Sequence, residues 1–102
     1  MSDKFYIKIH RAYRNVVAVC DSDILGKTFE EGKMQLEVRE SFYKGEERTT
    51  EEAIEILKSE KMNDSTFNIA GKKSVMLAGE AGIINKGNVG KVQGIPFALV
   101  LI

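Results

Sequence analysis

The chain has 102 residues, of which 43% are hydrophobic and 29% charged, and its formal net charge is zero. This composition is typical of a folded domain, and it excludes long disordered stretches, a disulfide framework and the strong basic excess of a dedicated nucleic-acid binder. No apolar run approaches the length of a membrane span and no signal segment is visible, so we expect one cytoplasmic domain over residues 1–102.

Basic charge gathers at the two ends of the sequence. Residues 1–14 carry four basic residues and one acidic residue, and residues 71–102 carry the same numbers, which gives +3 at each end. The 7 basic and 13 acidic residues in between give −6. This asymmetry concerns a binding partner only if the two ends meet in the folded protein.

The first elements in chain order predict a β-hairpin. Apolar and polar residues alternate over residues 4–10, which is the period of a half-buried strand. VVAVC, residues 16–20, is apolar on both faces and predicts a central strand. MQLEV predicts a third strand, with these side chains turned inward: Met34, Leu36 and Val38.

Two helices are predicted in the second half. TTEEAIEILKSEK begins with Thr49 and Glu52, which have the spacing of a capping box, and KKSVMLAGEA is followed by Gly82, a typical helix stop. Extended pieces separate the helices and follow them, and the last is a charge-free strand, FALVLI. We therefore predict an α+β domain with one mixed sheet of about five to six strands, an N-terminal hairpin and two helices packed against the sheet.

The segment CDSDILGKT ends like a phosphate-binding loop, with Gly26 and Lys27 before a threonine. Asp21 and Asp23 would place two negative charges beside the phosphates, and no long helix follows, so no nucleotide cofactor is expected. We predict instead that Asp21 caps a single helical turn over residues 22–25, which Gly26 closes.

Cys20 is the candidate nucleophile, and His10 is the one histidine that could act as its base. The register of the hairpin decides whether their side chains share a face of the sheet. A cysteine at the end of an apolar strand is most often a small core residue, and one Cys with one His cannot form a zinc site alone. We expect no bound metal and no catalytic residue, and the sequence favours a protein that is not an enzyme.

The polar face of the first strand combines cations with an aromatic ring, an arrangement that can hold RNA while a base stacks. A solvated outer face of an antiparallel sheet is the alternative interpretation. The candidate RNA-binding residues are Lys4, Tyr6, Lys8 and His10, with Tyr43, Lys44, Lys72 and Lys73 as outlying members.

Four motifs occur in order along the chain: VVAVCDSDILGKTFEEG, SFYKGE, NIAG before a helix, and GIPFA. Together they resemble domain-of-unknown-function family 424, an uncharacterised archaeal family of about this length, over the whole chain. The family pattern often has His after the proline, where this chain has Phe97, which weakens an enzyme interpretation. The motif residues are Cys20, Asp21, Leu25, Gly26, Lys27, Phe42, Tyr43, Gly45, Glu46, Asn68, Gly71, Pro96 and Ala98.

The resemblance implies an archaeal cytoplasmic protein linked to translation or RNA. It favours a non-enzymatic binding module associated with RNA or the translation machinery. A second hypothesis is a small ligand-binding protein or enzyme with a pocket walled by Asp21, Phe42, Tyr43 and Asn68. A third is a protein-interaction subunit or homodimer that buries the strand FALVLI at its interface.

Overall fold

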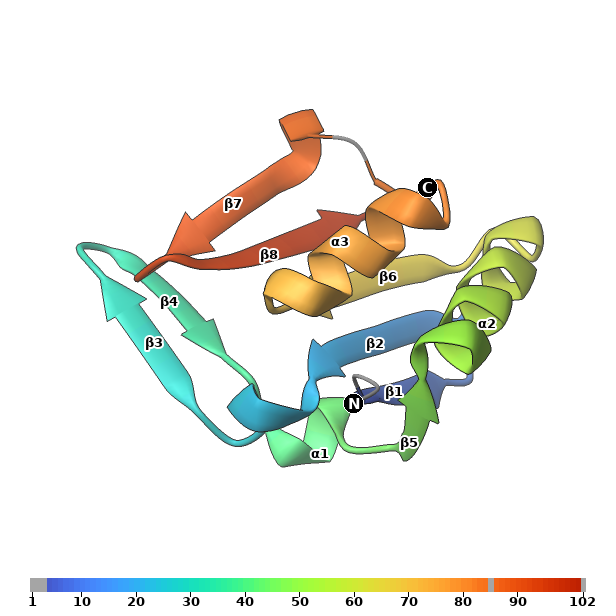
Figure 1. Ribbon diagram of the computed structural model, residues 1–102, viewed down its shortest axis with the longest axis horizontal. Coiled ribbons are helices and arrows are strands. Elements are labelled where there is room, and N and C mark those ends of the chain that lie inside the picture. The colour runs from blue at the N-terminus through green and yellow to red at the C-terminus, as the bar shows by residue number, and fades with distance from the viewer. Residues whose placement is uncertain (1–3, 85, 102) are drawn as a thin grey trace.

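The computed structural model describes residues 4–84 and 86–101, so Ile102, the last residue of the predicted C-terminal strand, lies outside the described residues. The main sheet has six strands in the order β5-β1-β2-β6-β8-β7 (Figure 1). Only β2 and β6 run parallel, and the other neighbouring strands are antiparallel. The strands are β1 (Lys4–His10), β2 (Val16–Asp21), β5 (Glu46–Thr49), β6 (Thr66–Ala70), β7 (Val89–Val92) and β8 (Ile95–Val100).

The remaining elements surround this sheet. Two helices, α2 and α3, lie on the same face, which we call the helix face, and the other is the reverse face (Figure 1). These elements are β3 (Thr28–Glu31), β4 (Met34–Glu37), α1 (Glu40–Tyr43), α2 (Thr50–Met62), α3 (Lys72–Glu80) and the 3-10 turns η1 (Ser22–Ile24) and η2 (Lys86–Asn88). The predicted α+β class, mixed sheet and N-terminal hairpin are confirmed.

The main core lies between the helix face and the two longer helices. Val17 and Val19 of β2 and Phe67 of β6 are essentially fully buried there, packed with Leu57 of α2 and Leu77 of α3. Alternate residues of each strand point to this side, so the period-two pattern of the first strand becomes one wall of the core. Burial of each such side chain stabilises the fold by about 1.5–3 kcal/mol.

Both predicted helix boundaries are confirmed by hydrogen bonds. The Thr49 hydroxyl accepts from the Glu52 amide at 3.3 Å and the Glu52 carboxylate accepts from the Thr49 amide at 3.0 Å, which completes the capping box. At the end of α3, Gly82 has φ 76° and the Ile83 amide donates to the carbonyl oxygen of Ala78 at 2.9 Å, the close of a Schellman motif.

A second core forms on one end of the reverse face, because the β3–β4 hairpin and α1 cover that end. Cys20 and Ala70 of the sheet are buried there against Leu36 and Val38. The hairpin also reaches the β7–β8 turn, where the Gln93 amide donates to a Glu31 carboxylate oxygen at 2.6 Å. The other end of the reverse face has no such cover among the described residues.

The structure differs from the sequence predictions in two places. The strand MQLEV belongs to the two-stranded sheet, and Met34 is 46% exposed because it lies at the hairpin tip. The strands β3 and β5 were not predicted, since TFEE and EERT lack apolar periodicity and pair through backbone groups.

Within residues 4–84 and 86–101, no helix is long and apolar enough to cross a membrane.

The C-terminal strand β8 is an interior strand, paired with β6 on one side and β7 on the other. The β7 ladder covers residues 95–98 of the strand and the β6 ladder covers residues 97–100, so both neighbours pair with the strand only over residues 97–98. Beyond the β7 ladder, Leu99 and Leu101 are 52% and 70% exposed.

Candidate functional site

Asp21 ends β2 with its carboxylate turned to the helix face. One oxygen accepts from the Ser74 amide at 2.7 Å and the Ser74 hydroxyl at 2.6 Å, and the other accepts from the Lys73 amide at 3.1 Å. The predicted cap of the turn after β2 is wrong, because η1 receives no side-chain hydrogen bond from Asp21. The carboxylate instead caps α3, more than fifty residues away in sequence. Gly26 does close the turn, with φ 84°.

Gly71 makes the contact between Asp21 and α3 possible. It precedes α3 with φ 110°, a conformation that L residues rarely adopt, and an added Cβ would collide with the Asp21 carboxylate. The Gly71 amide donates to the Pro96 carbonyl oxygen at 2.9 Å, which ties this junction to β8. Asp21, Gly71 and Pro96 therefore form a structural joint between β2, α3 and β8.

Cys20 and His10 share the reverse face but do not form a catalytic pair. Cys20 lies opposite Tyr6 in the hairpin, and His10 lies opposite Val16, four residues further along the strand. At about 3.3 Å per residue, this offset separates the two side chains by about 13 Å. Burial, followed by the negative charges of Asp21 and Asp23, raises the pKa of the Cys20 thiol to about 12, so the thiol stays protonated.

We expect Cys20 in the folded protein to resist thiol reagents at pH 8. The side chain is fully buried and protonated, so modification requires local or global opening, and labelling with a disulfide reagent should be at least about 1,000-fold slower than in guanidinium. Ser59→Cys, at an exposed position of α2, supplies the control thiol and should react at once. Immediate labelling of both thiols in the folded variant would contradict this expectation.

The outer side of β1 is partly covered by α1. The Lys8 ammonium donates to the Ser41 carbonyl oxygen at 2.9 Å, and His10 Nε2 donates to the Phe42 carbonyl oxygen at 2.9 Å. Tyr6, further along the same side, packs against the second core. The polar face of the first strand is therefore anchored to α1 rather than fully solvated.

His10 and Phe42 form a stacked pair. Their ring centroids lie 4.6 Å apart with an interplanar angle of 18°, and Phe42 makes an edge contact with Tyr43 at 5.1 Å. Tyr43 is 7% exposed, and burial raises the pKa of its hydroxyl to about 12. Tyr43 thus belongs to the second core, whereas His10 and Phe42 remain partly exposed.

The sheet separates other residues that the sequence grouped. Lys72 and Lys73 begin α3 on the helix face, whereas Lys8 and His10 project from the reverse face. In the same way Asp21 contacts α3, while Phe42, Tyr43 and Asn68 lie on the reverse face, so these four residues do not wall one pocket. Lys4 and Lys44 are exposed near β5 and α1.

Asn68 is a partly buried residue in a row of side chains on the reverse face. The strand register places it beside Ala18 of β2 and Leu99 of β8, and Ala18 lies beside Lys8. No hydrogen bond joins the Asn68 amide group to a described residue, in contrast to the buried Asp21 carboxylate. Its donors and acceptor are therefore available to a ligand.

The turn between β1 and β2 presents a group that the sequence analysis did not select. Tyr13 is 99% exposed, and the exposed Arg11 and Arg14 flank it. No described residue forms an ion pair with either arginine. The turn is anchored by Asn15, whose side-chain oxygen accepts from the Ala12 amide at 3.4 Å. The available signal was the stretch RAYR, a cation-aromatic-cation pattern in a predicted turn.

The family model described as protein of unknown function (DUF424) matches residues 10–102. The chain belongs to this family. The resemblance inferred from the motifs is therefore confirmed. The crystal structure of an uncharacterized conserved protein from the archaeon Methanopyrus kandleri superposes with a TM-score of 0.81 at 22% identity, covering 95% of this chain and 90% of that chain. This likeness concerns the fold. No curated protein matched the chain.

Several motif residues that suggested DUF424 have structural roles. A side chain at Gly45 would collide with the Ile7 carbonyl oxygen, so this position permits the close crossing of β5 and β1. Backbone groups of Lys27 bond to Ile24 and to Val38, which ties η1 to the end of β4. Among residues 4–84 and 86–101, no group of three side chains could hold a metal ion.

Proposed function

We propose that this protein is a non-enzymatic RNA-binding module, associated with RNA or the translation machinery, that holds single-stranded RNA at the β1–β2 tip. The tip consists of His10, Arg11, Tyr13, Arg14 and Phe42. The observation that carries the proposal is the 99% exposure of Tyr13 between two arginines. Exposed aromatic rings flanked by cations stack bases and contact phosphates in single-stranded RNA sites.

The stacked pair of His10 and Phe42 supplies a second aromatic platform beside the turn. Its rings are held by the hydrogen bond from His10 to the Phe42 carbonyl oxygen, so ordering them on binding costs little further entropy. Arg11 follows His10 directly in the chain and supplies a cation next to this platform. Two platforms and two arginines would serve a short stretch of single-stranded RNA.

Polar residues of the reverse face could extend the contacts that the tip makes with RNA. Lys8 and Asn68 lie on the reverse face, and the amide of Asn68 has donors and an acceptor that suit a base edge. Lys4 and Lys44 stay further away and would contribute charge rather than direct contacts. Lys72 and Lys73 lie on the other face and have no part in this site.

The test is binding of a fluorescent single-stranded RNA of about ten nucleotides, followed by anisotropy across a salt series. Tyr13→Ala should weaken binding about tenfold, because one base loses its stacking partner. The double variant Arg11→Gln, Arg14→Gln should lower the slope of log affinity against log salt by about 1.4, since two phosphate contacts are lost.

The matched control removes two exposed cations elsewhere, at Lys33 in the β3–β4 turn and Lys58 in α2. It changes the net charge of the protein equally and should leave the affinity nearly unchanged. An affinity that does not fall as salt rises, or an equal loss in the control, would contradict RNA binding at the tip.

A further inference from the structure

The helical layer leaves one end of the helix face open. Helix α3 packs on β2, β6 and β8, and β7 continues the sheet beyond the helix (Figure 1). Between α3 and the β7–β8 hairpin lies a hollow of about 440 Å³. This size falls within the range of about 300–1,000 Å³ that is common for small-molecule sites.

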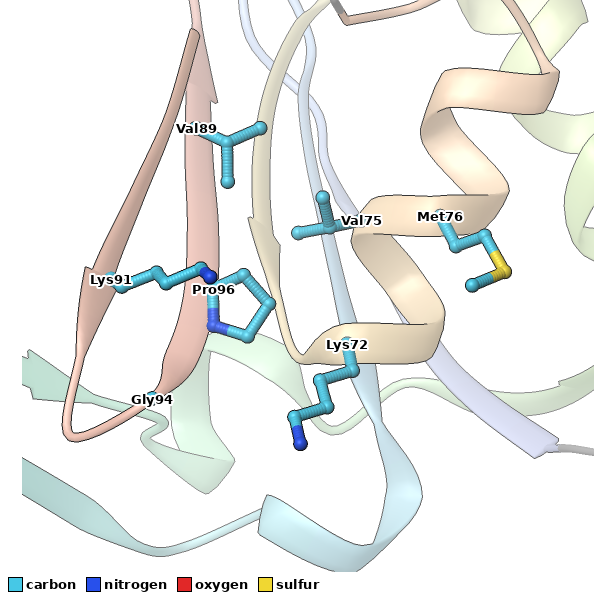
Figure 2. Close-up of a pocket in the computed structure, with 7 residues that line it drawn as sticks. All are labelled: Lys72, Val75, Met76, Val89, Lys91, Gly94 and Pro96. Atoms are coloured by element: carbon cyan, nitrogen blue, oxygen red, sulfur yellow. The ribbon is translucent and has the colours of Figure 1, made fainter. Parts of the chain in front are cut away.

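The walls of this hollow are mainly apolar. Figure 2 shows Val75 projecting from α3 toward the strands and Val89 projecting from β7 toward the helix, with the Pro96 ring of β8 beside Lys91. Pro96 is buried and has no backbone N–H, so the floor offers an apolar ring rather than a donor. Such a surface favours a ligand with a hydrocarbon body.

Two lysines stand at the hollow on opposite walls, Lys72 at the start of α3 and Lys91 on β7 (Figure 2). Neither forms an ion pair or a side-chain hydrogen bond with a described residue, and no lining residue is acidic. Their methylene stems extend the apolar wall while their ammonium groups remain at the solvent. The hollow therefore combines an apolar interior with unpaired positive charge at its mouth.

We propose that this hollow binds an organic monocarboxylate with a short hydrocarbon chain. The chain would lie against Val75, Val89 and Pro96, and the carboxylate would lie between the ammonium groups of Lys72 and Lys91. An alcohol of equal length lacks the charge and an amine carries the wrong one. This site lies across the sheet from the β1–β2 tip, so it is separate from the proposed RNA site.

The test follows the methyl signals of Val75 and Val89 by NMR while butanoate, hexanoate or octanoate is added. We expect saturable shifts at these methyls, with Met62, an 85% exposed methionine at the end of α2, unchanged as an internal control. The dissociation constant should fall about fourfold for each added methylene until the hollow is full, because each buried CH₂ contributes equally.

Variants then separate the charge from the apolar walls. Lys72→Gln with Lys91→Gln should weaken octanoate binding about tenfold, and hexanol should bind about tenfold more weakly than hexanoate. The Lys33→Gln, Lys58→Gln control keeps the wild-type affinity. Val89→Trp should abolish binding by filling the hollow, with its fold verified from the amide spectrum.

Several results would overturn the proposal. The methyl signals could show no saturable shift with any of the three carboxylates, or hexanol could bind as tightly as hexanoate. Equal affinity in the Lys72→Gln, Lys91→Gln variant and its control would also exclude the carboxylate position. Octanoate binding should survive Arg11→Gln with Arg14→Gln, so a failure at one site is distinguishable from a failure at the other.

Discussion

Asp21→Ala is expected to lower the free energy of unfolding by about 3 kcal/mol. The buried carboxylate accepts hydrogen bonds from the Lys73 amide and from the amide and hydroxyl of Ser74, and the substitution leaves these donors without their acceptor. Removing it also loosens the joint between β2 and α3. Urea unfolding followed by circular dichroism measures the change.

The matched control for Asp21 is Asp23→Ala, two residues away on the exposed side of η1. It also removes one negative charge from the segment, yet we expect a change within about 0.5 kcal/mol, because surface substitutions of this kind rarely cost more. Equal losses from both substitutions would show that net charge, rather than the cap on α3, accounts for the effect.

Gly71→Ala is the second substitution with a large expected effect, a loss of about 3 kcal/mol. Two causes act together, since the φ of 110° strains an L residue and the new Cβ collides with the Asp21 carboxylate. The thermal midpoint and urea midpoint of the variant measure this loss. In an Asp21→Ala background the collision disappears, so a double-mutant cycle should give a smaller cost for Gly71→Ala.

Gly79→Ala in α3 provides the control for Gly71. Nothing lies within 4 Å of the position of its Cβ and its φ is not positive, so alanine should raise the stability by about 0.5–1 kcal/mol through its higher helix propensity. A stabilising Gly79→Ala beside a destabilising Gly71→Ala separates the local collision from the general response to Gly→Ala. If Gly71→Ala raised the stability and Gly79→Ala lowered it, the structural joint would be refuted.

Much of the proposed RNA site could not be predicted from the sequence, because its exposure depends on tertiary contacts. The polar face of β1 was predicted from the alternation of its side chains, and this alternation is correct. Whether that face stays open depends on α1, which lies more than thirty residues later and bonds to Lys8 and His10. The exposure of Tyr13 also depends on the folded structure, because a short turn can either fold back on the sheet or project from it.

Features that depend on neighbours along the chain could be predicted from the sequence alone. The capping box at Thr49 and Glu52, the stop at Gly82 and the N-terminal hairpin each arise from residues within a few positions of one another. The motifs also determined the family. Local hydrogen bonds and side-chain periods are sufficient for such predictions.

Features that depend on distant segments follow from the way the chain folds. Folding joined Asp21 to α3, placed Cys20 and His10 four residues apart along one face, and formed β5 from a polar stretch at the sheet edge. It also left the hollow beside Lys72 and Lys91 by ending the helical layer before β7. In each case the partner comes from another part of the chain, and strand order and register, which no local pattern encodes, determine which groups meet.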